Sequence, residues 1–316
     1  MRICLVTPAP SGSQKGNRVT ALRWARVLRG LGHRVGIAQE YRAQRCDVLV
    51  ALHARRSADS VARFDSDHPD RPLILALTGT DLYGDIRTSP EAVRSLELAD
   101  RYVLLQPLGV EELPERLRPR ARVIYQSVDP PKVLPEPKAG VFEVCVMGHL
   151  RPVKDPFRTA EAARLLPPAS RLRVLHLGAA LSEEMARQAR AEESGNPRYR
   201  WLGELPRARA LRVLARCRLL SLTSHLEGGA NVIGESVVVG VPVVSSHIAG
   251  SVGLLGADYP GYFPVGDTRA LADLLLRAET EREFYADLKV RCRQLRGLFE
   301  PARESRSWVE LLRELV

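Results

Sequence analysis

Two glutamates bracket a glycine turn in residues 227–235 (EGGANVIGE). An apolar strand pattern ends just before this segment, near Leu222, and a helical pattern begins at Asn231. Glycines let the backbone approach a ligand closely, and the free N–H groups at a helix start can hold a phosphate. Glu227 and Glu235 could then accept hydrogen bonds from the hydroxyls of a sugar or a ribose. The alternative is a glycine turn followed by an ordinary capped helix, with Glu235 stabilising the helix dipole.

A cationic loop at residues 148–154 (GHLRPVK) follows another apolar strand pattern, at residues 142–147. Lys154 and Arg151 place positive charge in this loop, and an arginine guanidinium can bind an anion in a bidentate manner. The alternative is a basic loop that is only solvated. The loop and the glycine turn both follow strands, and ligands of open parallel sheets bind outside the carboxyl ends of strands.

Polar residues also follow three strand patterns in the first half of the chain. Residues 8–18 (PAPSGSQKGNR) join a strand to a helix and offer donors to an anion at the helix start. Residues 53–57 (HARRS) and 78–81 (TGTD) follow two further strands. The alternative is that these residues are helix caps and solvated charge. The residues expected to contact a small anionic acceptor are Gly12, Ser13, Lys15, Asn17, Arg18, His53, Arg55, Thr78, Thr80 and Asp81.

Short apolar strands alternate with amphipathic helical patterns along the chain, which is typical of parallel sheets covered by helices. In the first half the predicted strands are residues 3–6, 34–38, 47–52, 73–77, 102–105 and 122–125, with helices at 19–31 and 89–99. In the second half the predicted strands are residues 142–147, 172–177, 200–202, 219–222 and 241–245. The predicted helices there are 156–166, 182–190, 207–215, one from Asn231, 268–298 with an internal break, and 301–315.

A proline-rich stretch separates the two halves and predicts an interdomain linker. The predicted fold is α/β, with two doubly wound Rossmann-like domains facing each other across a cleft. We expect a first domain at residues 1–128 that holds the acceptor, a linker at 129–140, and a second domain at 141–298. Residues 299–316 are expected to form a helix that packs back on the first domain through the stripe Trp308, Leu311, Leu312 and Leu315.

Composition narrows the classes of protein to which the chain can belong. The 316 residues, 45% of them hydrophobic, are enough for two domains. We find neither a signal-peptide pattern nor an apolar run near the roughly 20 residues of a membrane span, so we expect a soluble protein. The five scattered cysteines include no Cys-x-x-Cys pair, which favours reduced thiols, a cytoplasmic location and no zinc. The net charge of +10 suits an acidic partner, but no nucleic-acid recognition signature accompanies it.

Residues 227–235 resemble the Glu-x7-Glu signature of GT4-type retaining glycosyltransferases, which adopt the GT-B fold. Residues 240–244 (GVPVV) and 148–154 carry the same resemblance. Residues 148–154 resemble the family element that grips the donor diphosphate, and Lys154 matches the lysine of that element. His149 replaces its usual arginine, and Arg151 could supply the missing positive charge. The resemblance implies that Glu227 contacts the transferred sugar and Glu235 the nucleotide ribose. It implies catalytic roles for Glu227, Lys154 and Arg151, and donor contacts for Gly148, His149, Leu202, Gly228, Gly229, Ala230, Asn231, Val232 and Glu235.

Residues 176–179 (HLGA) and 199–203 (YRWLG) occupy the places where this family forms the pocket for the nucleotide base, often through main-chain groups. Apolar core packing explains Trp201 equally well. Both interpretations stay open at the level of the sequence.

Seven strings are similar to the bacterial selenosugar synthases (SenB-type) of selenoneine biosynthesis, and together they span nearly the whole chain. They are GNRVTALRWARVLR, LVALHARRSA, LALTGTDLY, GHLRPVKDPFR, NPRYRWLGELP, HLEGGANVIGES and GSVGLLGADYPGYFPVGDT. The resemblance implies transfer of a hexosyl group from UDP-N-acetylglucosamine or UDP-glucose to selenophosphate, with loss of UDP and phosphate. No metal or other cofactor is expected. The alternatives are a conventional GT4 enzyme with a hydroxyl acceptor and a nucleotide- or nucleic-acid-binding protein without catalysis. Sugar preference, anomeric outcome and oligomeric state stay open.

Overall fold

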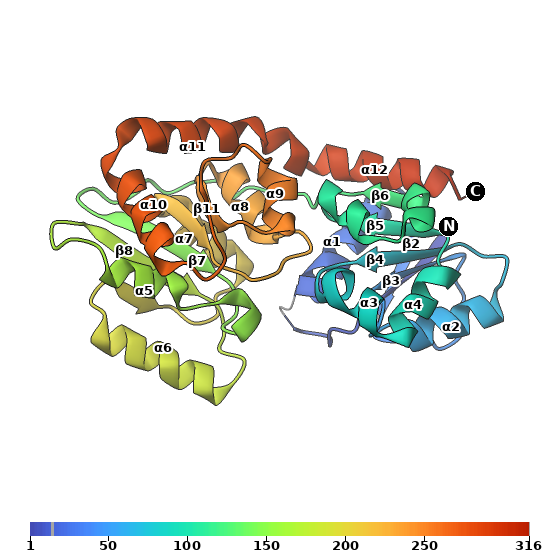
Figure 1. Ribbon diagram of the computed structural model, residues 1–316. Coiled ribbons are helices and arrows are strands. Elements are labelled where there is room, and N and C mark those ends of the chain that lie inside the picture. The colour runs from blue at the N-terminus through green and yellow to red at the C-terminus, as the bar shows by residue number, and fades with distance from the viewer. Residues whose placement is uncertain (14–15, 316) are drawn as a thin grey trace. The chain divides into compact units, whose positions relative to one another are not determined.

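The computed structural model describes residues 1–13 and 16–315 and divides into two compact units (Figure 1). The first unit comprises Met1–Ser127, Glu227–Gly229 and Phe299–Val316. The second unit comprises Val128–Leu226 and Ala230–Leu298. The chain therefore crosses between the units at Ser127 and again near Phe299, and the short segment Glu227–Gly229 groups with the first unit although its neighbours belong to the second.

In the described residues of the first unit, six parallel strands form one sheet in the order β2-β1-β3-β4-β5-β6. The central strands β3 and β4 are buried along their whole length, as continuous apolar runs in parallel sheets usually are. The strands are β1 (Arg2–Val6), β2 (Arg34–Ala38), β3 (Val48–Leu52), β4 (Leu73–Leu77), β5 (Arg101–Leu104) and β6 (Ala121–Val123). The helices are α1 (Gly16–Gly30), α2 (Ala58–Asp67), α3 (Ile86–Thr88), α4 (Pro90–Leu98) and α12 (Pro301–Arg313).

The first unit buries one apolar cluster on each face of its sheet, because successive strand residues point to opposite sides. On one face, Leu49 and Ala51 of β3 pack with Phe64 of α2. On the other face, Val48 and Val50 pack with α1 and α12. Three-layer packing of this kind places helices on both sides of the sheet and leaves the strand ends accessible to loops.

The last helix is fixed to the first unit by aromatic and polar contacts. The rings of Trp24 in α1 and Trp308 in α12 pack edge to face with centroids 5.1 Å apart. Trp24 Nε1 also donates to the Glu304 carboxylate at 3.0 Å, and the Ser127 N–H donates to the same carboxylate at 2.9 Å. Glu304 is buried, and these donors satisfy both of its carboxylate oxygens, as a buried polar group requires. Trp308, Leu311 and Leu312 of the predicted stripe are buried here.

In the described residues of the second unit, a second six-stranded parallel sheet has the order β12-β11-β10-β7-β8-β9. Its strands are β7 (Phe142–Met147), β8 (Leu172–Leu177), β9 (Tyr199–Trp201), β10 (Leu219–Leu222), β11 (Val243–Ser246) and β12 (Tyr262–Phe263). Its helices are α5 (Arg158–Arg164), α6 (Glu183–Gly195), α7 (Arg207–Arg216), α8 (Asn231–Val239), α9 (Ala249–Leu255), α10 (Thr268–Thr280) and α11 (Arg282–Gln294).

The structure differs from the predicted elements mainly in short segments. Helix α2, helix α9, the edge strand β12 and a π-helical turn at Asp81–Asp85 were not predicted. The predicted break within residues 268–298 lies at Glu281, between α10 and α11. Residues 128–140, all of them described, contain neither helix nor strand. None of the helices in the described part of the chain is long and apolar enough to cross a membrane.

Candidate active site

The ends of β7 and β10 are neighbours at the point where the strand order of the second sheet reverses. β7 pairs with β8 on one side and with β10 on the other. In open parallel sheets, ligands bind outside the carboxyl ends of the strands at such a switch point, because the two following loops leave in opposite directions. The residues predicted to hold the donor follow these two strands: Gly148, His149, Arg151 and Lys154 after β7, and Ala230, Asn231, Val232 and Glu235 after β10.

The cationic loop of residues 148–154, named the lysine loop from here on, is held in shape by the end of β10. Residues Pro152–Lys154 form a 3-10 turn, which Asp155 closes in the left-handed conformation with φ 44°. The Thr223 hydroxyl lies 3.0 Å from the Lys154 carbonyl oxygen and 2.8 Å from that of Asp155. The His225 N–H donates to the Val153 carbonyl at 2.9 Å. The cationic loop is therefore part of the sheet edge rather than a solvated excursion.

Within this loop the three basic side chains have different environments. Lys154 is half-buried, and its Cδ passes 4.0 Å from the place that a Cβ on Gly148 would occupy. Arg151 is exposed. The His149 side chain is hydrogen-bonded to the loop after β8, because its Nδ1 accepts from the Ala179 N–H at 3.1 Å. The geometry favours Arg151 over His149 as the replacement for the family arginine.

Glu235 is buried on the second turn of α8, with 5% of its surface exposed. Its Oε1 lies 2.9 Å from Nη2 of Arg207, the first residue of α7, whose side chain is 42% exposed. Helix α8 ends at Gly240, which takes the left-handed conformation that favours glycine. A buried carboxylate can accept hydrogen bonds from a vicinal diol.

The predicted base-side segment lies at the end of β9, two strands away from β7. The Leu202 N–H donates to the His176 carbonyl at 2.8 Å, and Trp201 Nε1 donates to the Gly178 carbonyl at 2.9 Å. Trp201 is thus tied to β8 by its polar edge and is not only an apolar packing residue. Leu202 is half-buried beside the end of β8.

The glycines of the turn 227–229 are required by the first unit. A Cβ on Gly228 would lie 2.5 Å from the Thr78 carbonyl, and one on Gly229 would lie 2.4 Å from Cβ of Leu105. Both positions thus require glycine for this backbone, and their contact with a donor stays a prediction. Glu227 is half-buried, and its charge contributes, after burial and Glu112, to raising the pKa of Tyr83 to about 12.

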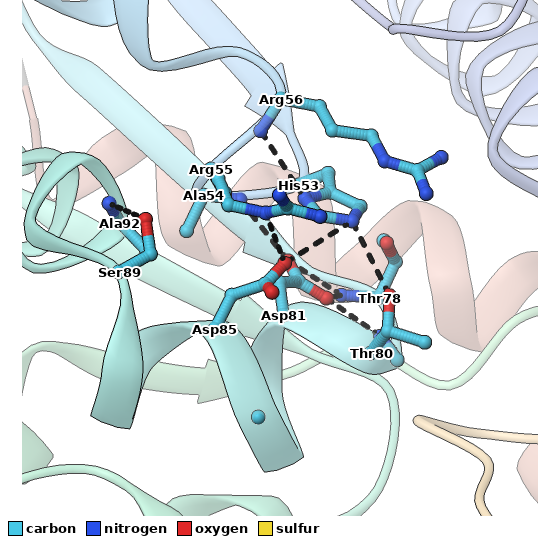
Figure 2. Close-up of polar contacts among 12 residues, drawn as sticks. His53, Ala54, Arg55, Arg56, Thr78, Thr80, Asp81, Asp85, Ser89 and Ala92 are labelled. Atoms are coloured by element: carbon cyan, nitrogen blue, oxygen red, sulfur yellow. Dashed lines mark hydrogen bonds and ion pairs between the residues drawn. The ribbon is translucent and has the colours of Figure 1, made fainter.

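In the first unit, Asp81 orders the loops that follow β3 and β4 (Figure 2). Its carboxylate is fully buried and accepts three backbone hydrogen bonds: from the N–H groups of Ala54 at 3.1 Å, Thr78 at 3.1 Å and Gly79 at 2.9 Å. Charge-assisted bonds of this kind hold a loop strongly. The Asp81 side chain therefore has a structural task, and its contact with an acceptor stays a prediction.

His53 lies above Asp81 in the same cluster and has an unusual backbone (Figure 2). Its φ is +78°, in the left-handed region that few non-glycine residues adopt. The Arg56 N–H donates to its Nδ1 at 3.4 Å, so Nε2 carries the hydrogen and donates to the Thr80 hydroxyl at 3.3 Å. Burial lowers the pKa of His53, although the Asp81 carboxylate acts in the opposite direction.

The remaining residues predicted for the acceptor are distributed differently. Arg55 pairs with Asp85 of the π-helical turn, with Nε 3.1 Å from Oδ2. Gly12 takes the left-handed conformation with φ 82°, and the Ser13 N–H donates to the Pro10 carbonyl at 3.2 Å. Asn17 and Arg18 are half-buried in the first turn of α1. Lys15 lies outside the described residues.

Three comparisons place these observations among known proteins. The fold matches HepE from Anabaena in complex with UDP and glucose, at a TM-score of 0.80, 16% identity and full coverage of both chains. It matches sucrose-phosphate synthase from Thermosynechococcus elongatus at 0.77 and 15% identity, with 99% and 98% of the two chains covered. A search of curated protein sequences found no match. The family model described as glycosyl transferases group 1 matches residues 135–294, half of the chain.

The chain belongs to the group 1 glycosyltransferases.

The predicted fold class, two helix-covered parallel sheets of the GT-B type, is confirmed for this glycosyltransferase. The family match covers β7 to β12 and includes the lysine loop and both glutamates. The structural matches to HepE and to a glycosyltransferase from Rickettsia africae, at a TM-score of 0.76 and 14% identity, extend over nearly the whole chain. The first unit is therefore supported by fold similarity, while the second is supported by sequence as well.

Four residues near the strand ends of the second unit make contacts that the sequence did not predict. Arg207 follows a proline at a helix start, and nothing local indicates that it reaches Glu235. Thr223 could have been singled out because it directly follows a predicted strand. His176 and Tyr199 were read only as parts of a base pocket, although a histidine inside an apolar strand usually needs a buried partner. All four act through contacts with residues at least 23 positions away in the chain.

Proposed function

We propose that this glycosyltransferase is a selenosugar synthase that transfers a hexosyl group from a UDP-sugar to selenophosphate. The bond between the anomeric carbon and the UDP oxygen breaks, and a bond between that carbon and selenium forms. UDP leaves with the electron pair. Water then cleaves the selenium–phosphorus bond, which releases phosphate and a 1-selenosugar.

The observation that carries the donor half of this proposal is the edge formed by β7 and β10. It brings a rigid loop bearing Lys154 and Arg151 to the switch point of the sheet from which α8 presents Glu235. The two cations would neutralise the charge that develops on the leaving diphosphate. Glu235 would accept the ribose hydroxyls. A uridine nucleotide is supported by the fold match to HepE, which has been crystallised with UDP and with UDP-glucose.

The acceptor half rests on the similarity of seven strings to selenosugar synthases. A selenium anion is a potent nucleophile without a general base, so binding and orientation supply most of what its attack requires. Lys15, Asn17 and Arg18, together with the cluster around His53, are the residues proposed to hold the selenophosphate oxygens. We propose that no metal takes part, because the segments expected to line the donor and acceptor sites contain no Asp-x-Asp motif.

A conventional hydroxyl acceptor is the second candidate, and one feature of the first unit favours it. Arg55, one of the cations counted toward an anionic acceptor, is paired with Asp85, and the same carboxylate lies 3.7 Å from Nε2 of His53. These contacts reduce the positive charge offered to an anion. Glu227 would then be the group that could take the proton of an attacking hydroxyl.

One assay separates the two candidates. The protein is incubated with UDP-N-acetylglucosamine or UDP-glucose and with one of four acceptor conditions: selenophosphate, inorganic phosphate, a panel of glycan and metabolite hydroxyls, or no acceptor. UDP release is followed while products are identified by mass spectrometry. Selenium-dependent UDP release with a selenium-bearing sugar is the expected result. UDP release that needs a glycan or metabolite hydroxyl and ignores selenophosphate would overturn the selenosugar proposal. Unchanged rates after treatment with EDTA are expected, and loss of activity that Mg²⁺ or Mn²⁺ restores would overturn the metal-free proposal.

A further inference from the structure

A buried histidine contacts the first residue of the lysine loop in the second unit. His176 of β8 is 1% exposed, and burial lowers its pKa to about 4, against the opposing effect of a hydrogen bond to the Gly148 carbonyl. The ring is therefore neutral at neutral pH. A neutral histidine with both nitrogens inside a protein must place one as donor and the other as acceptor.

Two contacts fix which nitrogen carries the hydrogen. Nε2 lies 3.3 Å from the Gly148 carbonyl oxygen, which can only accept, so Nε2 is the donor. Nδ1 lies 3.0 Å from the Tyr199 hydroxyl, which must then donate to it. Burial raises the pKa of Tyr199, so the phenol keeps its proton. The relay runs from β9 through β8 to the first residue after β7.

The relay holds the Gly148 carbonyl toward β8. A Cβ on Gly178, the residue that follows β8, would lie 2.0 Å from that same oxygen, so only glycine leaves room for it. In a planar trans peptide the N–H of the next residue points the opposite way from the carbonyl. The His149 N–H is thus turned away from β8, and no acceptor for it is found among the residues that the structure describes.

We propose that His176, held in one tautomer by Tyr199, is a positioning residue that turns the Gly148–His149 peptide so that its N–H donates to the diphosphate of the donor. The inference rests on the proposed function, because it assumes a nucleoside diphosphate at the end of β7. It adds a backbone donor to the two cations of the lysine loop. It also explains a polar relay that runs across three strands of this sheet.

The binding of UDP and of uridine separates this role from a merely structural one. A diphosphate donor matters for UDP and not for uridine, which has no phosphate. In His176→Leu the Kd for UDP is expected to rise about threefold to tenfold, the value of one hydrogen bond, while the Kd for uridine changes less than twofold. His176→Gln keeps an amide N–H near the position of Nε2 and should recover most of the UDP affinity.

Tyr199→Phe is the second variant, because it removes only the hydroxyl that fixes the tautomer. It should weaken UDP binding about twofold to threefold, again without affecting uridine. His33→Leu, a histidine of the first unit, serves as the matched control and should leave both constants unchanged. Affinities are measured by calorimetry on variants whose circular dichroism matches the unsubstituted protein, and Tyr199→Phe decides the matter if His176→Leu does not fold.

Two outcomes overturn the inference alone: a folded His176→Leu variant that binds UDP like the unsubstituted protein, or equal losses for UDP and uridine. If His176→Leu does not fold, an unchanged UDP affinity in Tyr199→Phe overturns it. Failure of the unsubstituted protein to bind UDP would instead overturn the proposed function and this inference with it.

Discussion

The strand ends of the two units are held in order by opposite means. In the first unit a charged side chain orders the backbone: the Asp81 carboxylate gathers three backbone N–H groups, and Arg55 is paired with Asp85. In the second unit a neutral side chain does this: His176 donates to the Gly148 carbonyl, and glycine at residue 178 leaves room for it. In the first unit, these charged side chains therefore bind other groups of the protein.

A polar residue after a strand is therefore not automatically a ligand contact, since Asp81 follows a strand and binds backbone N–H groups. The second unit orders its loop with an uncharged relay, which leaves the cations Lys154 and Arg151 outside that relay. A site for a highly charged diphosphate gains from this arrangement, because a carboxylate in the place of the His176 ring would repel the ligand.

The first prediction concerns the pH dependence of the second unit. The pKa of His176 is about 4 in the folded protein and about 6.5 when unfolded, so between these values only the unfolded chain binds the proton. The stability linked to His176 is therefore fully present above pH 6.5 and is lost as the pH falls toward 4. The loss is on the order of 3 kcal/mol.

Hydrogen exchange of peptides from β8, followed from pH 7 to pH 4.5 after correction for intrinsic rates, measures this effect within the second unit. His176→Gln should remove most of the pH dependence. The first unit provides the contrast: burial lowers the pKa of His53 too, but the nearby carboxylates of Asp81 and Asp85 oppose the shift. Equal acid sensitivity of the peptides from β3 and β8 would contradict the distinction between a charged and a neutral edge.

The second prediction removes the charge that orders the first unit. Asp81→Asn keeps the size of the side chain but turns one acceptor oxygen into a donor that faces backbone N–H groups. We expect the free energy of unfolding of the first unit to fall by about 2 kcal/mol, with UDP affinity unchanged. Urea unfolding measured by unit-resolved hydrogen exchange tests it. Asp85→Asn is the control and should cost less, because that side chain is 19% exposed.

The third prediction tests the ligand-binding edge of the second unit. Glu235→Gln weakens the hydrogen bonds that a carboxylate offers to a ribose diol, so the Kd for UDP should rise about tenfold or more. Uridine should lose affinity by the same factor, because both ligands carry the ribose. Calorimetry with the two ligands distinguishes this pattern from that of His176→Leu. Glu227→Gln is the counterpart and should lower kcat while leaving the Kd for UDP in place.

What the sequence predicts well here depends on local patterns. The buried runs VLVAL and LILAL specify β3 and β4 because parallel strands covered on both faces are apolar throughout. The turn from β10 into α8 is equally local: Asn231 was predicted as the start of this helix and is its first residue. Placing the cationic loop and the glycine turn after strands needs only these patterns and the rule that ligands bind at strand ends.

What the sequence does not predict depends on register and on long-range pairing. His176 reaches Gly148 because β8 pairs with β7 in the register that sets His176 opposite Val146. Asp81 binds the N–H of Ala54 because the ends of β3 and β4 are adjacent. Gly228 and Gly229 closely approach atoms of Thr78 and Leu105, about 150 and 124 positions away, and no local pattern reveals this approach.

The fourth prediction has the smallest expected effect and concerns Lys154. Replacing it by methionine keeps the apolar stem that passes Gly148 and removes one charge from the half-exposed loop. The donor KM should rise about fivefold, since one partly screened charge is lost while the loop stays clamped by Thr223.

Salt dependence makes the test of Lys154 specific. Added salt screens the attraction between a cation and a diphosphate, so the KM of the unsubstituted enzyme should rise between about 50 and about 500 mM NaCl. Over this range the Debye length falls from roughly 13 Å to roughly 4 Å. In Lys154→Met this rise should be smaller, and Arg151→Met should show the same trend with a lesser effect, because that side chain is exposed. A salt slope identical in all three proteins would mean that the edge of the second unit does not act through charge, and the contrast with the first unit would then be one of backbone order alone.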